Sequence, residues 1–365
     1  MSETNENFTW HSESDAPAPR RMSPVDDRLK ADVALARLRR RETLLYTGDW
    51  NNARQLLTAV GRRLSSPTKA KSALEAFREE RRNRAVEHEI LSRLVVELDR
   101  DYKLSLSRAP DVAEACTQVW GPATTDRTVV SIKTLLGMIG AAEWRRRGLK
   151  VPGLTGTLHP HYGVYSPTRT EYVELLAQVK DVKGKRALEL GCGTGVLSFI
   201  LLQNGASEVL ATDVDPRAVA CATENAKALG LAERFRAIET DTYPEGTFDL
   251  VVCNPPWIPE PPKTRLDRAV FDDDSQMLTG FLSGLGEHLR PDGEGILILS
   301  DLAVILGLRS EQWLEQELAA AGLSVAWTNS TQAKHGKAKD ASDPLHTARS
   351  REVTTIYGLR RAPAS

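Results

Sequence analysis

The stretch Leu188-Glu-Leu-Gly-Cys-Gly-Thr-Gly195 decides how this chain of 365 residues is organised. It ends an apolar, β-prone run at Arg186–Leu190 and leads into an apolar helical run at Val196–Gln203. Three glycines let the backbone turn sharply and approach a ligand closely. Their spacing is GxGxG, whereas a dinucleotide-binding turn has GxGxxG, and Val196 occupies that sixth position. The stretch therefore predicts a ligand-binding turn between a strand and a helix, and argues against a dehydrogenase.

Further short apolar runs follow this turn at regular intervals. Helical patterns separate the first six runs, which predicts an α/β fold with a mostly parallel sheet and helices on both faces. The polar segment Asn329–Arg351 is expected to contain no helix, so the last strand is expected to run antiparallel. The expected strands are Arg186–Leu190, Glu208–Asp213, Phe235–Thr240, Phe248–Cys253, Gly295–Ser300, Ser324–Thr328 and Val353–Leu359.

The preceding part of the chain has a different pattern. Residues 1–25 are polar and predict a disordered tail. Residues 26–148 show helical spacing and predict an all-α domain, in which Lys69–Leu104 forms one long helix or two in line, followed by helices near 111–119 and 127–147. A connector rich in Gly and Pro covers 149–169, and the sheet domain is expected at 170–365.

Charge is divided unevenly between these parts. The whole chain has a net charge of −1, which excludes a uniformly basic protein. Residues 1–150 hold 27 of the 48 Lys and Arg and 21 of the 49 Asp and Glu, so they are net positive. Two interpretations remain open, solvated helix faces or a surface for an acidic macromolecule. The basic clusters are Arg39–Arg41, Arg62–Arg63, Arg81–Arg82 and Arg145–Arg147.

Targeting and metal signals are not found in the sequence. No apolar run reaches the length that crosses a bilayer, and the acidic first 25 residues do not resemble a secretory or transit signal. The four cysteines contain no CxxC pair, so no metal site is expected and the thiols are expected to be reduced. A cytoplasmic protein without membrane partners is the resulting expectation.

Carboxylates at the ends of the first three expected strands suit an adenosine carrying an amino-acid group. Glu189 can help to hold an ammonium group, and Asp213 can accept both ribose hydroxyls. Asp215 precedes Pro216 and fits the N-cap of a helix better. Asp241 can accept a hydrogen bond from an adenine amino group, although a turn residue is the alternative.

The fourth expected strand ends in Asn254-Pro-Pro-Trp257. Pro255 and Pro256 have no amide hydrogen, so their carbonyls remain acceptors beside one amide side chain and one large aromatic. The Asn254 side-chain oxygen and the Pro255 carbonyl can accept the two hydrogens of a planar –NH2 group, with Trp257 against its plane. The alternative is a loop in which Trp257 anchors the core.

Together, the glycine turn and this tetrapeptide resemble the class I S-adenosylmethionine-dependent methyltransferases. Within them the sequence is similar to the small-domain and HemK-like N-methyltransferases, over about residues 160–361. The resemblance implies a Rossmann-like sheet, S-adenosyl-L-methionine as cofactor, and catalysis by Asn254, Pro255, Pro256 and Trp257. The cofactor residues that it implies, together with the pattern above, are Thr168, Glu189, Gly191, Cys192, Gly193, Gly195, Asp213, Val214, Asp241, Thr242 and Asn254.

The segment Gly163–Glu171 resembles the one that closes over the cofactor in HemK-like enzymes, with Thr170 and Glu171 matching and the arginine displaced to Arg169. Two departures concern the substrate. Trp257 stands where tyrosine is usual in glutamine methyltransferases, and Phe271–Gln276 replaces their Gly-Gly stretch. The run Asp272–Asp274 is expected to be the solvated start of a helix.

The sequence therefore predicts an enzyme that transfers a methyl group to a planar amino or amide nitrogen. The expected substrate is a macromolecule, either an RNA base or a protein glutamine, recognised through the basic helical domain. A small-molecule amine and a non-catalytic cofactor-binding regulator are the alternatives. Tyr162, Tyr165 and His335 are candidate substrate contacts, unless the tyrosines pack the connector and His335 is exposed. The basic segment Gln332–Lys339 is a solvated loop or a phosphate contact.

Overall fold

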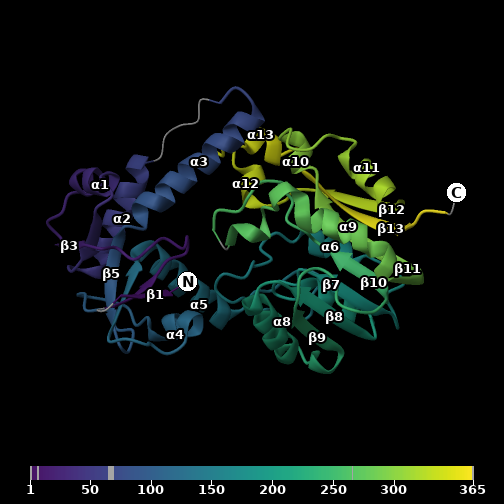
Figure 1. The fold of residues 1–365 in the computed structure, drawn as a ribbon, viewed down its shortest axis with the longest axis horizontal. Helices are drawn as coiled ribbons and strands as arrows, with labels where there is room; N and C mark the ends of the chain where they lie inside the picture. Colours follow the sequence, from purple (N-terminus) through teal and green to yellow (C-terminus); the bar gives the residue numbers. More distant parts are fainter. Residues whose placement is uncertain (1, 6–7, 65–69, 265, 364–365) are drawn as a thin grey trace. The chain divides into compact units, whose positions relative to one another are not determined.

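The computed structural model describes residues 2–5, 8–64, 70–264 and 266–363. The chain forms two compact units (Figure 1). Unit 1 comprises residues 1–71 and 78–143, and unit 2 comprises 72–77 and 144–365. The chain passes from one unit to the other at 71/72, 77/78 and 143/144, and each unit is described by itself.

A seven-stranded sheet forms the centre of unit 2, in the order β12-β13-β11-β10-β7-β8-β9 (Figure 1). Strands β9, β8, β7, β10 and β11 pair in parallel, whereas β13 runs antiparallel to both of its neighbours. The predicted mostly parallel sheet with an antiparallel last strand is confirmed. The strands are β7 (Arg186–Leu190), β8 (Glu208–Asp213), β9 (Phe235–Glu239), β10 (Phe248–Cys253), β11 (Leu289–Ser300), β12 (Leu323–Gln332) and β13 (Val353–Arg361).

Helices cover both faces of this sheet and bury two apolar clusters. On one face α6 (Glu171–Ala177), α7 (Val196–Gln203) and α8 (Pro216–Ala228) pack around Phe199. On the other face α9 (Gln276–His288) and α11 (Trp313–Ala320) pack around Phe281. The shorter helices are η1 (Ala232–Arg234), η2 (Leu266–Ala269), η3 (Asp273–Ser275), α10 (Leu302–Ile305), α12 (Gly336–Lys339) and α13 (His346–Arg349).

The segment between the last two strands differs from the expectation. It contains the four-residue helices α12 and α13, and α12 falls within the basic segment that was expected to be a loop. Ala338 and Ala348 are 6% and 3% exposed, so each helix buries a small apolar side chain. Helices this short give no periodic signal, because one turn is shorter than any amphipathic repeat.

Unit 1 is an α/β structure, and the predicted all-α domain is wrong. Its six-stranded sheet has the order β1-β2-β6-β5-β4-β3. The strands are β1 (Ser2–Asn5), β2 (Phe8–His11), β3 (Met22–Val25), β4 (Thr43–Tyr46), β5 (Leu94–Asp99) and β6 (Arg127–Ser131). The helices that lie wholly or mostly in unit 1 are α1 (Ala31–Arg39), α2 (Trp50–Leu64), α3 (Ala73–Leu91), α4 (Ala113–Trp120) and α5 (Ile132–Arg147).

Short buried strands explain the error in unit 1. The segment expected to be one long helix breaks after Leu91, and β5 follows with Leu94, Val95 and Val96 fully buried. Likewise, β6 replaces the first turns of the helix expected at 127–147. A buried strand is apolar on both faces, so its spacing also satisfies a helical template and periodicity cannot separate the two.

The predicted disordered tail is also wrong for the residues described between 8 and 25. Strand β2 pairs in parallel with β6, and β3 pairs in parallel with β4. Phe8 and Trp10 are each 6% exposed and pack against Val95 and Val129. The Trp10 indole also donates a hydrogen bond to the Ala16 carbonyl at 2.8 Å. Two large buried aromatic side chains therefore fix this segment to the core, although its polar composition predicted disorder.

No helix among the residues that the structure describes combines the length and hydropathy needed to cross a membrane.

Truncating Trp10 should destabilise unit 1 if this segment belongs to its core. We expect Trp10→Ala to lower the free energy of unfolding by about 3 kcal/mol, because a large buried aromatic leaves a cavity. Trp144→Ala is the matched control, since Trp144 is 55% exposed, and should change stability by less than about 0.5 kcal/mol. Urea unfolding followed by circular dichroism measures both. Equal stability of Trp10→Ala and the parent would contradict the placement of this segment.

Candidate active site

The glycine turn between β7 and α7 is tied to the end of the neighbouring strand. Gly191, Gly193 and Gly195 have φ values of 72°, 50° and 82°, in the region that favours glycine. The amides of Gly191 and Cys192 both donate to the Thr212 carbonyl at 2.8 and 2.9 Å. These bonds hold the turn across the carboxyl ends of β7 and β8, the edge where parallel sheets bind ligands.

Space around the three glycines is unequal. A Cβ at Gly195 would lie 2.5 Å from the Phe199 ring, and one at Gly191 would lie 2.5 Å from the Met277 Cε. A Cβ at Gly193 would meet no described atom within 4 Å. Gly191 and Gly195 therefore permit close packing, whereas Gly193 borders open space. Cys192 is 3% exposed, and burial raises the pKa of its thiol well above the usual value.

Glu189 lies beneath this turn and is 1% exposed. Both the backbone amide and the hydroxyl of Ser198, in the first turn of α7, donate to its Oε2. Burial raises the pKa of Glu189 to about 8 despite these hydrogen bonds. A fixed carboxyl group whose ionisation is penalised by burial would gain strongly from a neighbouring cation. Its predicted role in holding an ammonium group stays a prediction.

Asp213 joins the glycine turn to the end of β8. Its Oδ2 accepts from the Gly193 amide at 3.0 Å, and its Oδ1 accepts from the Asp215 amide at 3.0 Å. Burial raises the pKa of Asp213. The following Val214 is 56% exposed. Asp215 is the N-cap of α8 and accepts from the Arg217 amide at 2.9 Å, so its predicted capping role is confirmed.

Asp241 and Thr242 follow β9 on the same edge of the sheet. Asp241 is exposed, and its Oδ1 accepts from the Thr242 hydroxyl at 3.0 Å. Thr242 has a φ of 59° and its carbonyl accepts from the Thr212 hydroxyl at 3.0 Å. The structure therefore brings the ends of β7, β8 and β9 together, as the sequence predicted, and leaves the Asp241 carboxylate accessible.

The tetrapeptide Asn254–Trp257 follows β10, which pairs with β7 and β11. The Trp257 indole donates to the Asn254 Oδ1 at 3.0 Å, so the amide oxygen is fixed by its own neighbour. Pro255 is buried and Pro256 is half-buried. The Trp257 ring is half-buried and contacts both apolar clusters of unit 2. Trp257 therefore anchors the core and orients Asn254 at the same time.

Two buried charged residues lie near this tetrapeptide, and one of them, Arg309, binds it directly. The Arg309 guanidinium, 9% exposed, donates to the Trp257 carbonyl at 3.1 Å and to the Ser275 hydroxyl at 2.8 Å. Burial lowers the pKa of Arg309 to about 10. Asp272 is 7% exposed and accepts from the amides of Met277 and Leu278, the start of α9. The expectation of a solvated acidic run is thus wrong for Asp272, whereas Asp273 and Asp274 are exposed.

A second polar group lies against Trp257. Arg169 stacks on the indole and pairs with Glu352, which also contacts His335. The His335 side chain is only 14% exposed, so the expected exposed histidine is wrong. Tyr162 and Tyr165 are half-buried, burial raises the pKa of Tyr165, and Thr168 is exposed.

Sequence reasoning missed Glu352, Ser300 and Arg309. None belongs to a motif, and each meets its partner only through the tertiary fold, so no local pattern could have identified them. Only Glu352 and Ser300 lie at or next to an end of an apolar strand, and a polar residue at that place is common.

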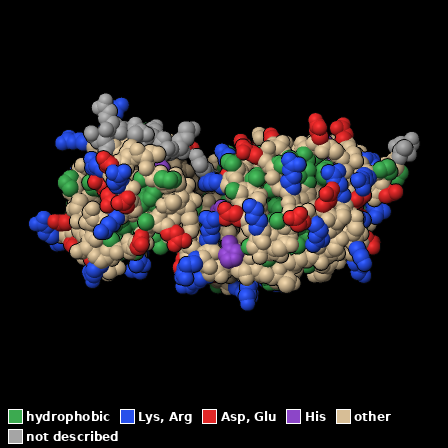
Figure 2. All heavy atoms as spheres, turned by 90° about the horizontal axis from the view of Figure 1, so that it is seen from below, with side chains coloured by type: hydrophobic (Ala, Val, Ile, Leu, Met, Phe, Trp, Pro, Cys, Tyr) green, Lys and Arg blue, Asp and Glu red, His purple; other side chains and the backbone are tan. Residues whose placement is uncertain are grey.

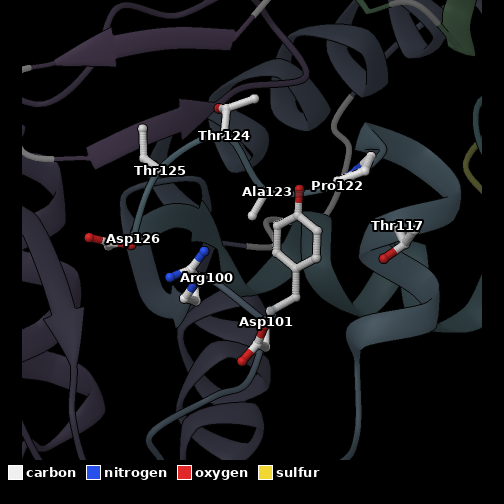
Figure 3. Close-up of a pocket in the computed structure, with 9 residues that line it drawn as sticks. Arg100, Asp101, Thr117, Pro122, Ala123, Thr124, Thr125 and Asp126 are labelled. Carbon is white, nitrogen blue, oxygen red and sulfur yellow. The ribbon is translucent and has the colours of Figure 1, made fainter.

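Unit 1 contains a separate hollow of about 440 Å³ between the end of β5, α4 and the start of β6 (Figure 3). Most of its lining is exposed and polar, including Arg100, Asp101 and Asp126. None of the predicted cofactor or acceptor residues lines it.

Comparisons with known proteins identify the class. The family model of the methyltransferase small domain matches residues 155–301. A protein from Methanocaldococcus jannaschii, with the provisional name of a protein N5-glutamine methyltransferase, is 32% identical over 162 residues, which are 42% of this chain and 80% of that protein. The chain belongs to this family of class I S-adenosylmethionine-dependent methyltransferases and is an enzyme of that class.

Other curated relatives match shorter stretches, and a solved structure of low identity matches a longer one. Ribosomal protein L11 methyltransferases from Thermotoga neapolitana and Vibrio parahaemolyticus are 38% and 34% identical, over 25% and 24% of this chain and only 34% and 30% of their own lengths. A crystal structure of ribosomal protein L11 methylase from Lactobacillus delbrueckii has a TM-score of 0.38 at 21% identity, covering 58% of this chain and 83% of that one.

S-adenosyl-L-methionine is the cofactor of this class, and the residues present fit it. Gly193 borders open space, and Asp213 and Glu189 supply carboxylates on either side of the glycine turn. Val214 offers an exposed apolar surface beside Asp213. Glu189 would hold the amino-acid end of the cofactor, and Asp213 would hold its ribose. Val214 and Asp241 would both contact the adenine.

Removing the Asp213 carboxylate should weaken cofactor binding. We expect Asp213→Ala to raise the dissociation constant of S-adenosylhomocysteine at least roughly tenfold, because two buried hydrogen bonds to the ribose would be lost. Isothermal titration calorimetry measures the constant. Asp215→Ala is the matched control, which should lose about 1 kcal/mol of stability through its helix cap and retain the affinity. An unchanged constant for Asp213→Ala would contradict the assignment.

Binding should also release a proton from Glu189. The raised pKa of about 8 keeps this carboxyl protonated at neutral pH, and a bound ammonium group would favour the ionised form. Affinity for S-adenosylhomocysteine should therefore rise between pH 6 and pH 8. Calorimetry in buffers of different ionisation enthalpy counts the released proton. Glu189→Gln should abolish this release, and proton uptake by the parent protein would refute the predicted contact.

Proposed function

We propose that the enzyme transfers a methyl group to the nitrogen of a planar –NH2 group. The observation that carries this proposal is the hydrogen bond from the Trp257 indole to the Asn254 Oδ1 at 3.0 Å. An indole only donates, so it identifies the oxygen of this amide and fixes its direction. A carboxamide oxygen has two acceptor positions, and the second remains for a hydrogen of the substrate.

The strand pairing supports the location of this acceptor. Cys253 of β10 lies opposite Leu190 of β7, so Asn254 and Gly191 follow directly on adjacent strand ends. The acceptor amide and the glycine turn thus occupy one edge of the sheet. Holding the two reactants side by side is itself a large part of the acceleration available to a methyl transfer.

The residues of the tetrapeptide then have separate roles. When bound, S-adenosylmethionine supplies an electrophilic methyl group, and its sulfonium sulfur becomes the neutral thioether that leaves. The Asn254 oxygen and the Pro255 carbonyl hold the two hydrogens and orient the nitrogen lone pair. As the nitrogen gains a bond to carbon it becomes positive, and these carbonyl dipoles stabilise that charge. One of its hydrogens then leaves as a proton to water, which restores a neutral product.

For the substrate we propose a carboxamide side chain of a protein, namely glutamine. The 32% identical relative carries the name of a protein glutamine methyltransferase, and the match covers 80% of its length. Charge on this chain gives less support to a nucleic acid. Members of three basic clusters, Arg41, Arg63 and Arg145, pair with carboxylates. On the face shown in Figure 2, basic and acidic side chains are interspersed.

Unit 1 is the proposed recognition part for that protein. The family model covers only residues 155–301, which all lie in unit 2. Unit 1 has its own sheet and core, so it can present a binding surface without disturbing the catalytic fold.

Transfer of a labelled methyl group identifies the substrate. Extract from cells that lack this protein is incubated with the full chain and S-adenosylmethionine carrying a labelled methyl group, and then divided between nuclease and protease. We expect the label to be lost only with protease and mass spectrometry to find a methylated glutamine. Label lost to nuclease would replace glutamine by a base amine, and label in small molecules would contradict a macromolecular substrate.

The Asn254 amide should matter for turnover and much less for the cofactor. We expect Asn254→Ala to lower kcat by about 100-fold, because the carbonyl that stabilises the developing charge is lost. S-adenosylhomocysteine affinity should change less than about threefold. Asn329→Ala, on the exposed edge strand β12, is the control and should keep full activity. Full turnover by Asn254→Ala would refute the role.

A further inference from the structure

We propose that Arg169 and Glu352 are positioning residues that hold the Trp257 indole in the orientation that fixes Asn254. The expected effect on catalysis rests on the function proposed above, whereas the orientation of the indole does not. The sequence of contacts runs from Glu352 to Arg169, then to the Trp257 ring and finally to the Asn254 amide.

Arg169 lies over the face of the tryptophan ring. Its guanidinium carbon is 4.8 Å from the centre of the Trp257 ring. At that distance the cation is attracted by the electron density of the indole face, and the two planar groups restrict each other's rotation. A lysine at this position would keep the charge but offer no flat surface, so the contact is specific to arginine.

Glu352 anchors Arg169 to the sheet. This carboxylate is fully buried and precedes β13, next to the end of β11. It accepts from the Ser300 hydroxyl at 2.6 Å and from the Arg169 Nη2 at 3.0 Å, and His335 Nε2 lies 3.4 Å from its second oxygen. A buried carboxylate with several partners is rigid, because moving away from any of them would leave its charge without compensation in the protein interior.

The remaining edge of the guanidinium is held less firmly. The Arg169 Nε is buried and has no hydrogen-bond partner among the described residues, and the Glu171 Oε2 lies 4.0 Å away. Glu171 is occupied by the Lys334 amide at 2.7 Å. Arg169 is therefore placed by its bond to Glu352 and by the Trp257 face, so these two contacts determine its position together.

The last contact controls which atom Asn254 presents. Rotation about the terminal bond of an asparagine side chain has a broad, roughly two-fold profile, so a free amide easily exchanges its oxygen and nitrogen. A flipped amide would direct an –NH2 group at the substrate –NH2, and neither would accept. The indole bond prevents this flip. Anything that lets the Trp257 ring rotate would therefore weaken the acceptor without removing it.

The backbone of Trp257 does not depend on Arg169. Arg309 binds the Trp257 carbonyl, and Ile258 is bridged to Phe271. Replacing Arg169 should therefore free the ring alone and leave the tetrapeptide in place. This separation makes the proposal testable by a variant that still folds and binds cofactor.

The first test observes the indole directly and needs no substrate. The chain has seven tryptophans, and Trp257→Phe assigns one of the indole N–H signals in a ¹⁵N spectrum of the full chain. We expect Arg169→Gln and Glu352→Gln to shift or broaden that signal. Arg186→Gln is the matched control, because Arg186 stacks 4.7 Å over Phe248 and pairs with Glu208 at the opposite end of the strands. An unchanged signal in Arg169→Gln would overturn the proposal.

The second test measures coupling in catalysis. We expect Arg169→Gln to lower kcat about tenfold with unchanged S-adenosylhomocysteine affinity. In the Trp257→Phe background, which has no indole N–H, the same substitution should change kcat less than about twofold. Additive losses would overturn the proposal. If no –NH2 substrate is methylated, the function proposed above fails, and the indole spectrum still decides the positioning role.

Discussion

The site depends on two amides that donate to one carbonyl. Gly191 and Cys192 both bind the Thr212 oxygen, and Gly193 binds the Asp213 carboxylate. These bonds hold the glycine turn that follows β7 against the end of β8. They also fix the backbone of the three glycines, all of which have positive φ. The energetic cost of that conformation is small only for glycine, so the turn tolerates little change. Every cofactor residue that we infer is placed relative to this junction.

The parallel sheet divides the work between its strands. The residues assigned to the cofactor lie at or just after the ends of β7, β8 and β9, and those assigned to the acceptor follow β10. Glu352, just before β13, holds the Arg169 side chain that lies over Trp257, and Ser300 at the end of β11 donates a hydrogen bond to Glu352. The acceptor amide is therefore supported by residues at the end of β11 and just before β13 as well as by its own strand. Catalysis by orientation requires such rigidity, because the substrate nitrogen must be aligned while the methyl group is transferred.

Local patterns predicted the central strands of unit 2, missed its short helices α12 and α13, and failed for unit 1. Strands β7, β8 and β10 and helix α7 occur at the predicted residues, because each is a short apolar run bounded by turn residues. In unit 1, Leu94–Asp99 satisfied a helical template although it is a buried strand, and the aromatic pair Phe8 and Trp10 lay in a polar segment. The supporting side chains were inaccessible to sequence for another reason. Arg169 and Glu352 are 183 positions apart and meet only in the folded sheet.

A crystal structure of the full chain with S-adenosylhomocysteine and a glutamine-containing peptide would show the proposed site directly. We expect both ribose hydroxyls within hydrogen-bond distance of Asp213. We also expect the glutamine nitrogen between the Asn254 Oδ1 and the Pro255 carbonyl, with the thioether sulfur in line behind it. Electron density for the nucleoside away from the glycine turn, or an amide nitrogen bound by other residues, would contradict these assignments.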